Sequence, residues 1–497
     1  MKVLFAASEA SPLIKTGGLA DVASSLPLAL TQMGNDVRVT LPAYRGVAEQ
    51  LHGLQPIGSV VVPGLAEPVG LLAGRLAEQG PQFVLVKAPG LYDRDGGPYV
   101  DTTGRPYADN ARRFAVFSRA VAAMALGQVG DGWRPDVVHC NDWQAGLVPA
   151  LLSREWNRPA CLFTIHNLAY QGLYDQQEFR RLELPADLWS VEGLEFHGRF
   201  SFIKGGIAYA DAITTVSPTY ASEICSPELG YGLEGLLCHR QDRLFGVLNG
   251  IDTEAWNPAT DPLIPANYDA ADLAPKAKDK QALQAAYGLP ERADALLFGH
   301  IGRLVEQKGA DLIIEVLPRL LEHPQVQLVV LGSGEPHLEA ALATAAARYP
   351  DRVGIFLGYD EALSHLLEAG ADCFLMPSRF EPCGLNQMYS LRYGTVPIVH
   401  RTGGLADTVV DAGTGALLDG SANGFVFEHA SPESLWRAIE RAVQFRSRPQ
   451  TYWEKMQRVG MACDFSWRAS AERYLDLYRF ALDHPMVPRR RLQGEPA

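Results

Sequence analysis

Short apolar runs of strand length alternate with amphipathic stretches along most of the chain. Val22, Leu26 and Met33, for example, lie at helical spacing between the runs 2–7 and 36–41. A strand, a helix and a second strand of this kind form a β-α-β unit with parallel strands and a right-handed crossover. The pattern therefore predicts an α/β protein.

The apolar runs form two series, which predicts two domains. The first series continues through residues 82–87, 135–143, 161–167 and 212–217, and the second covers 295–301, 326–331, 353–357, 373–376 and 395–400. Between them lie three prolines and a lysine-rich segment, 276–280, which is typical of a crossing between domains. We predict domains at 1–246 and 247–464, a helix at 465–482 that packs back on the first domain, and a tail at 483–497.

A six-residue sequence, Thr-Gly-Gly-Leu-Ala-Asp, occurs once in each half, at 16–21 and at 402–407. A cation precedes both copies, Lys15 in the first and Arg401 in the second. Two halves that share the same strand-turn-helix element indicate a pair of Rossmann-like domains that face each other.

The segment 377–387 is the strongest candidate for chemistry. The apolar run before it and the helical pattern after it place Glu381 in a loop at the carboxyl end of a strand, where α/β sheets bind ligands. Pro382 and Gly384 shape the turn. The helix after Gly384 offers free backbone N–H groups to an anion or a sugar hydroxyl. The alternative is that Glu381 only caps a helix and that Arg379 is solvated.

Three other loops at strand ends carry candidate ligand groups. Gly17 and Gly18 allow close approach to the backbone, with Lys15 and Asp21 beside them. The alternative is a structural turn, and the G-x-G-x-x-G fingerprint of nucleotide dehydrogenases is absent.

Arg303 and Lys308 lie on a Gly-bounded loop, where two cations could clamp a diphosphate or could simply be solvated. Tyr359 could stack on a base, although an exposed turn aromatic is the more common case.

Polar residues also end two strands of the first half. His139 and Asp142 follow one strand and His166 ends the next, which favours a shared ligand site over isolated structural histidines. Metal binding is weakly supported, because the spacing of these residues is not that of a metal site. Asp93 and Asp95 match the D-x-D pattern of some sugar transferases, but the surrounding Gly and Pro residues favour a plain turn.

Composition and charge narrow the class of protein. The 497 residues are 47% hydrophobic and 20% charged, as in globular proteins. A net charge of −13 argues against a nucleic-acid partner. Seven scattered cysteines indicate reduced thiols in a cytosol. No signal peptide and no apolar run of membrane-spanning length is evident, so we expect a cytoplasmic protein that does not bind membranes.

Together these motifs resemble the bacterial glycogen synthases, which are close kin of plant starch synthases. Beyond the motifs above, the resemblance includes the segment 248–252 and covers nearly the whole chain. It implies a GT-B fold, with two doubly wound Rossmann-like domains facing a deep inter-domain cleft. It also implies ADP-glucose as donor and the non-reducing end of an α-1,4-glucan as acceptor. Transfer would retain the anomeric configuration without a metal or other cofactor.

The resemblance also assigns roles to residues. The implied catalytic residues are Glu381, Arg303, Lys308, His166 and Asp142. The implied donor-binding residues are Lys15, Gly18, Asp21, Tyr359, Cys383, Gly384 and Leu385. The residues expected to orient the acceptor are His139, Asn167 and Asn249. Asn386 departs from the threonine expected there.

Two other functions stay open on the sequence alone. One is a different GT-B transferase that uses UDP-glucose or makes a disaccharide, against which the Lys15 motif argues. The other is a sugar-nucleotide or glucan-binding protein without activity, which loss of the cationic pair or of Glu381 would indicate. Neither is lost here. A dehydrogenase is the least favoured class.

Overall fold

The computed structural model describes residues 1–486 and divides the chain into two compact units. Unit 1 comprises residues 1–250 and the segment that begins at Trp467; unit 2 comprises residues 251–466. The division thus falls after Gly250 rather than after Gly246. The last helix, α18 (Trp467–Asp483), packs in unit 1 against α1 (Gly18–Gln32) and β7 (Ala160–Ile165). Most of the segment 483–497 lies outside the described residues.

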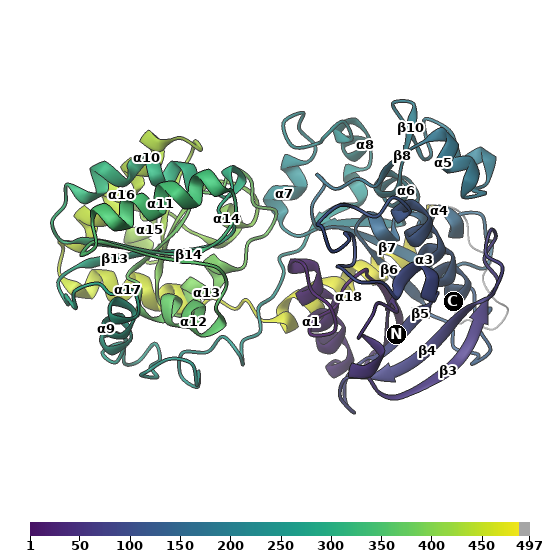
Figure 1. Ribbon diagram of the computed structural model, residues 1–497, viewed down its shortest axis with the longest axis horizontal. Helices are drawn as coiled ribbons and strands as arrows, with labels where there is room; N and C mark the ends of the chain where they lie inside the picture. The colour runs from purple at the N-terminus through teal and green to yellow at the C-terminus, as the bar shows by residue number, and fades with distance from the viewer. Residues whose placement is uncertain (487–497) are drawn as a thin grey trace. The chain divides into compact units, whose positions relative to one another are not determined.

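Unit 1 is built on a nine-stranded sheet in the order β12-β11-β7-β6-β1-β2-β5-β4-β3 (Figure 1). Its other strands are β1 (Lys2–Ala6), β2 (Asp36–Pro42), β3 (His52–Val60), β4 (Val69–Arg75), β5 (Gln82–Lys87), β6 (Val137–Asn141), β11 (Ala212–Thr215) and β12 (Leu244–Gly246). From β5 to β12 the pairs are parallel, whereas β4 is antiparallel to both of its neighbours. The predicted parallel core is confirmed, and β4 and the edge strand β3 extend the sheet beyond β5.

Helices cover the sheet of unit 1, and a small subdomain extends it. The remaining helices are α2 (Pro89–Tyr92), α3 (Asn110–Ala125), α4 (Leu147–Leu152), α5 (Gln176–Arg181), α6 (Phe202–Tyr209), α7 (Pro218–Glu223) and α8 (Glu234–His239). A three-stranded antiparallel sheet of β8 (Leu173–Asp175), β10 (Arg199–Ser201) and β9 (Glu195–Phe196) lies beside α5. Its aromatic residues join those of α3 and α6 in one buried cluster.

Unit 2 is built on a six-stranded, fully parallel sheet in the order β15-β14-β13-β16-β17-β18. Its strands are β13 (Leu296–Ile301), β14 (Val326–Gly332), β15 (Val353–Leu357), β16 (Cys373–Met376), β17 (Val396–His400) and β18 (Phe425–Phe427). Numbered along the chain, this is the order 3-2-1-4-5-6 of dinucleotide-binding folds. Unit 1 repeats it from β5 through β2, β1, β6, β7 and β11, so the prediction of two Rossmann-like domains is confirmed.

The sheet of unit 2 is buried on both faces, which explains its uninterrupted apolar strands. Its helices are α9 (Lys276–Ala286), α10 (Ala310–Leu321), α11 (Pro336–Arg348), α12 (Glu361–Gly370), α13 (Asn386–Arg392), α14 (Gly403–Thr408), α15 (Thr414–Asp419), α16 (Pro432–Arg446) and α17 (Gln450–Met461). Figure 1 shows α10, α11 and α16 on one face of the sheet and α9, α12, α13 and α17 on the other. Each face has its own apolar core.

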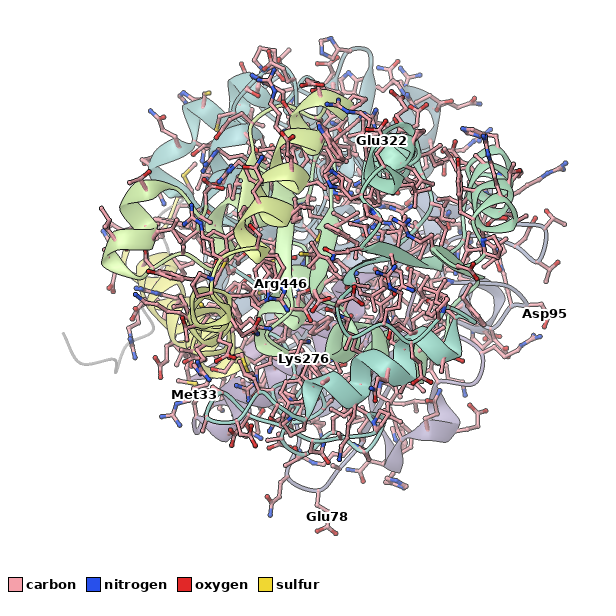
Figure 2. The ribbon with its side chains drawn as sticks, turned by 90° about the vertical axis from the view of Figure 1, so that its left-hand side faces the viewer. Met33, Glu78, Asp95, Lys276, Glu322 and Arg446 are labelled. Carbon is pink, nitrogen blue, oxygen red and sulfur yellow. The ribbon has the colours of Figure 1, made fainter. Side chains whose placement is uncertain are left out.

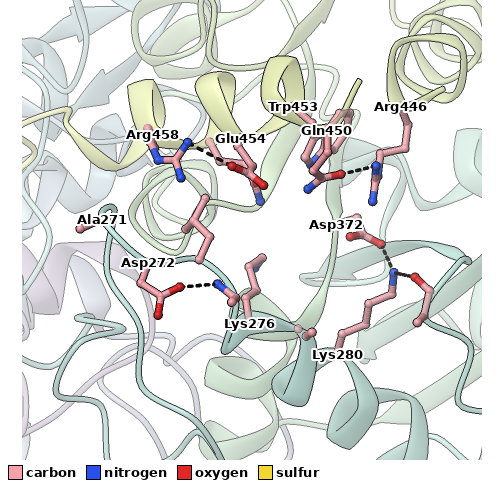
Figure 3. A pocket seen from close by; sticks show the side chains of 16 residues that line it. Ala271, Asp272, Lys276, Lys280, Asp372, Arg446, Gln450, Trp453, Glu454 and Arg458 are labelled. Atoms are coloured by element: carbon pink, nitrogen blue, oxygen red, sulfur yellow. Dashed lines mark hydrogen bonds and ion pairs between the residues drawn. The ribbon is translucent and has the colours of Figure 1, made fainter. Parts of the chain in front are cut away.

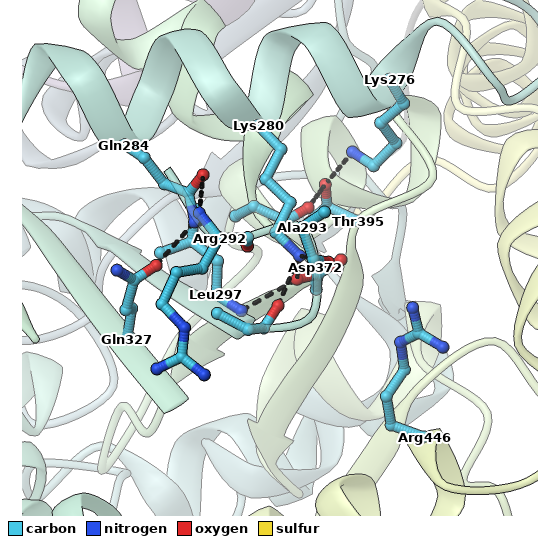
Figure 4. A network of polar contacts seen from close by, with 12 residues as sticks. Lys276, Lys280, Gln284, Arg292, Ala293, Leu297, Gln327, Asp372, Thr395 and Arg446 are labelled. Carbon is cyan, nitrogen blue, oxygen red and sulfur yellow. Dashed lines mark hydrogen bonds and ion pairs between the residues drawn. The ribbon is translucent and has the colours of Figure 1, made fainter. Parts of the chain in front are cut away.

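The lysine-rich segment is not a crossing between domains, which corrects the expectation from sequence. It forms α9, which packs on α12 inside unit 2. The Lys276 ammonium is buried and donates hydrogen bonds to the Ala369 carbonyl at 2.5 Å and the Thr395 hydroxyl at 2.8 Å. Lys280 is paired with Asp372 at 2.7 Å (Figure 4). These lysines are therefore anchors of the helix.

A cavity of about 330 Å³ opens beside this network, at the amino-terminal edge of the sheet. Figure 2 shows Lys276 and Arg446 close together on this face of unit 2, and Figure 3 shows the side chains that line the cavity. Lys280 and Arg458 there already have carboxylate partners in Asp372 and Glu454. Since ligands of α/β sheets bind at the carboxyl edge, we do not place the chemistry in this cavity.

Candidate active site

The candidate catalytic residues of unit 2 lie where its strand order reverses. The loop after β13 carries Lys308, and the loop after β16 carries Glu381. These two strands are adjacent, and their connections leave on opposite sides of the sheet. Ligands of doubly wound sheets bind at this switch point. The topology therefore places both residues at the expected binding position.

Lys308 and Glu381 form an ion pair, with 2.5 Å between Nζ and Oε2. The same carboxylate oxygen accepts a hydrogen bond from the Ser378 hydroxyl at 3.0 Å. Glu381 is 7% exposed, so its carboxylate has little contact with bulk water. A buried carboxylate that already has a cation is a preorganised charged site and not a helix cap alone.

A close backbone approach fixes the position of Lys308. Gly309, the next residue, has φ = 73° and lies against the backbone of Pro377. A Cβ there would come within 2.3 Å of the Pro377 carbonyl oxygen. Only glycine satisfies both the positive φ and this contact, so Gly309 allows the Lys308 loop to reach the Glu381 loop.

A second ion pair joins the same two loops. The Arg379 guanidinium binds both oxygens of Asp311, at 2.8 and 2.6 Å. The Arg379 N–H also donates to the Gln307 carbonyl at 2.8 Å. Arg379 is therefore a strut between the loops and not a solvated residue, and its planar fork suits this bidentate contact.

The two copies of the repeated Thr-Gly-Gly sequence have different surroundings. In unit 2, a Cβ on Gly403 or Gly404 would come within 2.0 Å of the carbonyl oxygen of Glu381 or Cys383, respectively. The backbone of that copy therefore packs directly against the Glu381 loop. In unit 1, a Cβ on Gly17 or Gly18 would meet no atom within 4 Å. Only the first copy leaves its backbone open to a ligand.

The remaining candidates of unit 2 surround the ion pair to different degrees. Arg303 is exposed, and its guanidinium donates to the Gln307 amide oxygen at 3.3 Å. Cys383 is buried, and Gly384 has φ = 73° in the turn before α13. Leu385 is the N-cap of that helix. Tyr359 is 76% exposed, so its ring is free to stack.

Asn386, which departs from the family pattern, has a clear structural contact. Its side-chain amide donates to the Ile301 carbonyl at 2.9 Å. The bond ties the start of α13 to the end of β13, next to the Arg303 loop. Nearby, Nδ1 of buried His300 donates to the Leu375 carbonyl at 2.8 Å, and its Nε2 has no partner among residues 1–486.

In unit 1, Lys15 lies in a loop that a buried glutamate organises. The Glu9 carboxylate accepts hydrogen bonds from the Thr16 N–H at 2.5 Å and from the Tyr99 hydroxyl at 2.7 Å. Lys15 itself is half-exposed and pairs with Asp21 at 2.7 Å. Glu9 therefore holds the loop in shape, and Lys15 and Gly18 remain accessible.

Asp142 and His166 meet at the carboxyl ends of the adjacent strands β6 and β7, next to the switch point of unit 1 between β1 and β6. Asp142 accepts a hydrogen bond from the His166 N–H at 2.8 Å and has the uncommon φ of 55°. Burial raises the pKa of Asp142 to about 7 and lowers the pKa of His166 to about 3. A positive φ in a non-glycine residue marks stored backbone strain, which clusters at functional sites.

The tautomer of His166 follows from its neighbour Asn141. The Asn141 amide nitrogen donates to the Ala6 carbonyl at 3.1 Å, so its amide oxygen faces His166 Nε2 at 2.9 Å. Nε2 must then carry the proton, and Nδ1 of the neutral ring is an acceptor. His166 can therefore accept a hydrogen bond from a hydroxyl group.

The three acceptor-orienting candidates lie in different environments. His139 is fully buried, with its ring nitrogens bonded to the hydroxyls of Tyr478 and Thr164 at 2.8 and 2.7 Å. That arrangement gives it a structural role and leaves no ring nitrogen for a sugar. The Asn167 amide oxygen accepts from the Ala169 N–H at 3.0 Å. The buried amide oxygen of Asn249 has no partner within the described part of the chain.

Both carboxylates of the D-x-D pair bind the same arginine. Arg45 pairs with Asp93 at 2.7 Å and also with Asp95. No group of three or more potential metal-ligating side chains occurs among residues 1–486. The interpretation of this segment as a plain turn is consistent with these contacts.

The structure thus brings Lys308 together with Glu381, and Asp142 together with His166, each pair within its own unit. Sequence reasoning missed Glu9, Ser378 and Asn141. A glutamate directly after a buried apolar strand was the one signal for Glu9. Nothing in the sequence marks Ser378 as the partner of Glu381, three residues later, or Asn141 as the partner of the more distant His166.

Family models and known proteins match the chain over nearly all of its length. A model described as the starch synthase catalytic domain matches residues 2–239, and one for glycosyl transferases group 1 matches residues 280–458. Glycogen synthase 1 of Methylococcus capsulatus is 52% identical over 97% of both chains. The glycogen synthase of Cellvibrio japonicus is 53% identical over 96% of this chain and 98% of its own.

Solved structures also match the chain over nearly all of its length. The catalytic domain of starch synthase IV from Arabidopsis thaliana, bound to ADP and acarbose, has a TM-score of 0.85 and 34% identity. It covers 97% of this chain and 99% of its own. A sucrose-phosphate synthase from Thermosynechococcus elongatus matches with a TM-score of 0.58 and 18% identity. The match covers 96% of this chain and 98% of that one and shows a shared fold alone.

Two Rossmann-like units, with charged residues at their switch points, define the chain as a glycosyltransferase of the GT-B fold. It belongs to the glycogen synthase family, in the branch that includes the starch synthases. No helix within residues 1–486 is long and apolar enough to cross a membrane.

Proposed function

We propose that the protein transfers glucose from ADP-glucose to the non-reducing end of an α-1,4-glucan, with retention at the anomeric carbon. The observation that carries this proposal is the Lys308–Glu381 ion pair at the switch point of unit 2. The names of its relatives and the ADP in the starch synthase structure support the choice of substrates.

The chemistry requires stabilisation of two opposite charges. Breaking the bond between glucose and phosphate leaves negative charge on the diphosphate and positive charge on the sugar. In this proposal Arg303 and Lys308 stabilise the diphosphate. Glu381 binds glucose hydroxyls and favours the cationic sugar. Because the ion pair holds Lys308 and Glu381 in place, these two groups need little reorganisation during the reaction.

The other residues bind and orient the substrates. Tyr359 provides a face for adenine, and the turn from Cys383 to Leu385 provides backbone groups for the donor. In unit 1, we assign Lys15, Gly18 and Asp21 to donor binding. Neutral His166 accepts a hydrogen bond from a sugar hydroxyl through Nδ1, and Asp142 fixes the backbone that carries this histidine.

We further assign Asn167 and Asn249 to contacts with the acceptor. The buried, unpartnered oxygen of Asn249, noted above among the described residues, is suited to accept from a hydroxyl. His139 is left out of this set, because its two ring nitrogens already bond to protein hydroxyls. We also propose that the enzyme works in the cytoplasm and needs no metal.

The experiment is a donor comparison. ADP or UDP release is measured from ADP-glucose and UDP-glucose, with and without glycogen, and with and without EDTA. We expect glycogen-dependent release from ADP-glucose that is faster than from UDP-glucose and unchanged by EDTA. Release from UDP-glucose alone would contradict the donor assignment. Inactivation by EDTA that Mg²⁺ or Mn²⁺ reverses would contradict the metal-free assignment.

A further inference from the structure

Two cysteines of unit 1, Cys225 and Cys238, are in contact, the side chain of the second against the backbone of the first. Of the seven cysteines, four are buried, Cys225 and Cys463 are half-buried, and Cys238 is exposed. The Cys238 thiol donates to the Cys225 carbonyl at 3.2 Å, and the Cys225 thiol donates to the Ala221 carbonyl at 3.5 Å. The sequence gives no hint of this contact, because twelve residues separate the pair and no C-x-x-C motif is present.

The intervening loop holds both sulfur atoms in place. It is closed by backbone hydrogen bonds from Gly230 to Ser226 and from Leu233 to Gly230, each at 2.8 Å. The side chains of Leu233 and Leu237 are buried beneath it. Cys225 ends the turn after α7, and Cys238 lies in α8. The pair is therefore anchored by packed structure on both sides.

The same loop contacts the segment that follows His166. The Gln171 amide donates to the Tyr231 carbonyl at 3.0 Å, and the Leu168 N–H donates to the hydroxyl of buried Tyr220 in α7 at 3.2 Å. Tyr231 has φ = 51°, an uncommon conformation for a tyrosine. The loop and α7 are thus in direct hydrogen-bond contact with the segment that follows His166.

We propose that Cys225 and Cys238 are a redox modification site, which closes to an intramolecular disulfide when the protein meets a low-molecular-weight disulfide. The exposed Cys238 reacts first. Its thiolate attacks one sulfur of the small disulfide, forms a mixed disulfide and releases one small thiol. Cys225 then gives its proton to water and attacks the Cys238 sulfur, which releases the second small thiol. The protein loses two hydrogens, and the small disulfide becomes two thiols.

The order of these steps follows from the surroundings of the two sulfurs. Burial and the neighbouring Cys238 raise the pKa of Cys225 to about 11, so Cys225 is a poor first nucleophile. Once Cys238 is part of a mixed disulfide, it can no longer carry a negative charge beside Cys225. Attack within the same loop is then favoured by proximity.

The expected consequence for activity rests on the proposed function. To bond with Cys225, the Cys238 sulfur must leave the carbonyl that it contacts now, which shifts the end of α8 and, through this short helix, the preceding loop with Tyr231. We expect the hydrogen bond from Gln171 to weaken and the KM for glycogen to rise about fivefold, the effect of one neutral hydrogen bond. Dithiothreitol should reverse the change.

The test incubates the full-length protein with oxidised glutathione and identifies its products by mass spectrometry. We expect a loss of about 2 Da and a peptide that links Cys225 to Cys238. Cys225→Ser should stop at one glutathione on Cys238, and Cys238→Ser should give neither product at this site. Cys463→Ser, the matched control at the other half-buried cysteine, should form the disulfide as the wild type does.

A wild type that keeps glutathione on Cys238, with Cys225 still open to alkylation, would overturn the proposal. A disulfide that forms in the wild type but not in Cys463→Ser would also overturn the proposal. If the disulfide forms and the KM for glycogen is unchanged, the coupling to the active site is wrong. Since mass spectrometry detects the bond without any activity, failure of the proposed function would show separately as absent ADP release in the reduced protein.

Discussion

Removing the cation of the Lys308–Glu381 pair should damage stability and catalysis by separate routes. Lys308→Ala leaves the carboxylate of Glu381 in a nearly buried position with only the Ser378 hydroxyl as a known partner. Breaking a fully buried pair in this way costs about 3–5 kcal/mol. The Lys308 side chain is 22% exposed, so water can enter, and we expect about 1–3 kcal/mol.

Lys308→Ala should raise the activation free energy of the reaction by more than it lowers the free energy of unfolding. Lys308 is proposed to stabilise the charge that develops on the leaving diphosphate. Losing one preorganised group of this kind costs about 3 kcal/mol, which is roughly a hundredfold or more in kcat. Arg303→Ala offers a comparison, because it removes an exposed cation and should lower kcat with little change in the free energy of unfolding.

A second substitution, at Glu381, separates the loss of stability from the loss of activity. In Lys308→Ala/Glu381→Gln no buried charge is left without its partner, so we expect most of the lost stability to return while the activity stays low. Urea unfolding measures the first quantity and ADP release the second. The reasoning is refuted if Lys308→Ala keeps near-normal kcat. Equal stability losses in the single and double variants would refute the account of the ion pair.

Three further variants test the supports of the two switch points. Gly309→Ala should destabilise the protein by about 1–3 kcal/mol in urea, because its positive φ and the contact with Pro377 both disfavour a Cβ; wild-type stability would contradict the close approach. Arg379→Met and Asp311→Asn should show a coupling energy of about 1 kcal/mol in a double-mutant cycle, since the pair is partly exposed; additive effects would contradict a strut. The raised folded-state pKa of Asp142 makes its contribution to stability greatest below about pH 4 and lost as pH rises towards about 7, so Asp142→Asn should gain about 2–3 kcal/mol over wild type between pH 5 and 7.5; an unchanged difference would contradict the shift.

The parallel sheets could be predicted because their strands are buried on both faces and read as short apolar runs. The run 373–376 gave β16 with the same ends. The edge strand β3 was missed, because it is largely exposed and lacks an apolar run. Its partner β4 was missed with it. The segment 276–280 was misread, because buried lysines that donate to carbonyl groups have the composition of a solvated linker.

The candidate site could be predicted in part for a related reason. Glu381 and Lys308 stand out because they follow buried strands beside glycines. The ion pair between them could not be predicted, because it depends on the approach of Gly309 to Pro377, which only the folded chain reveals. The sequence likewise could not tell that His139 is held between two hydroxyls while His166 keeps an available nitrogen.

Incorporation of glucose from ADP-glucose into glycogen by the wild type and by Glu381→Gln tests the central claim most directly. The amide keeps the size of the side chain and the Ser378 contact but lacks the negative charge that the cationic sugar needs. We predict that the wild type extends glycogen, whereas the folded variant is slower by roughly a hundredfold or more. Equal incorporation by the two proteins, at equal stability, would contradict the placement of the active site at Glu381.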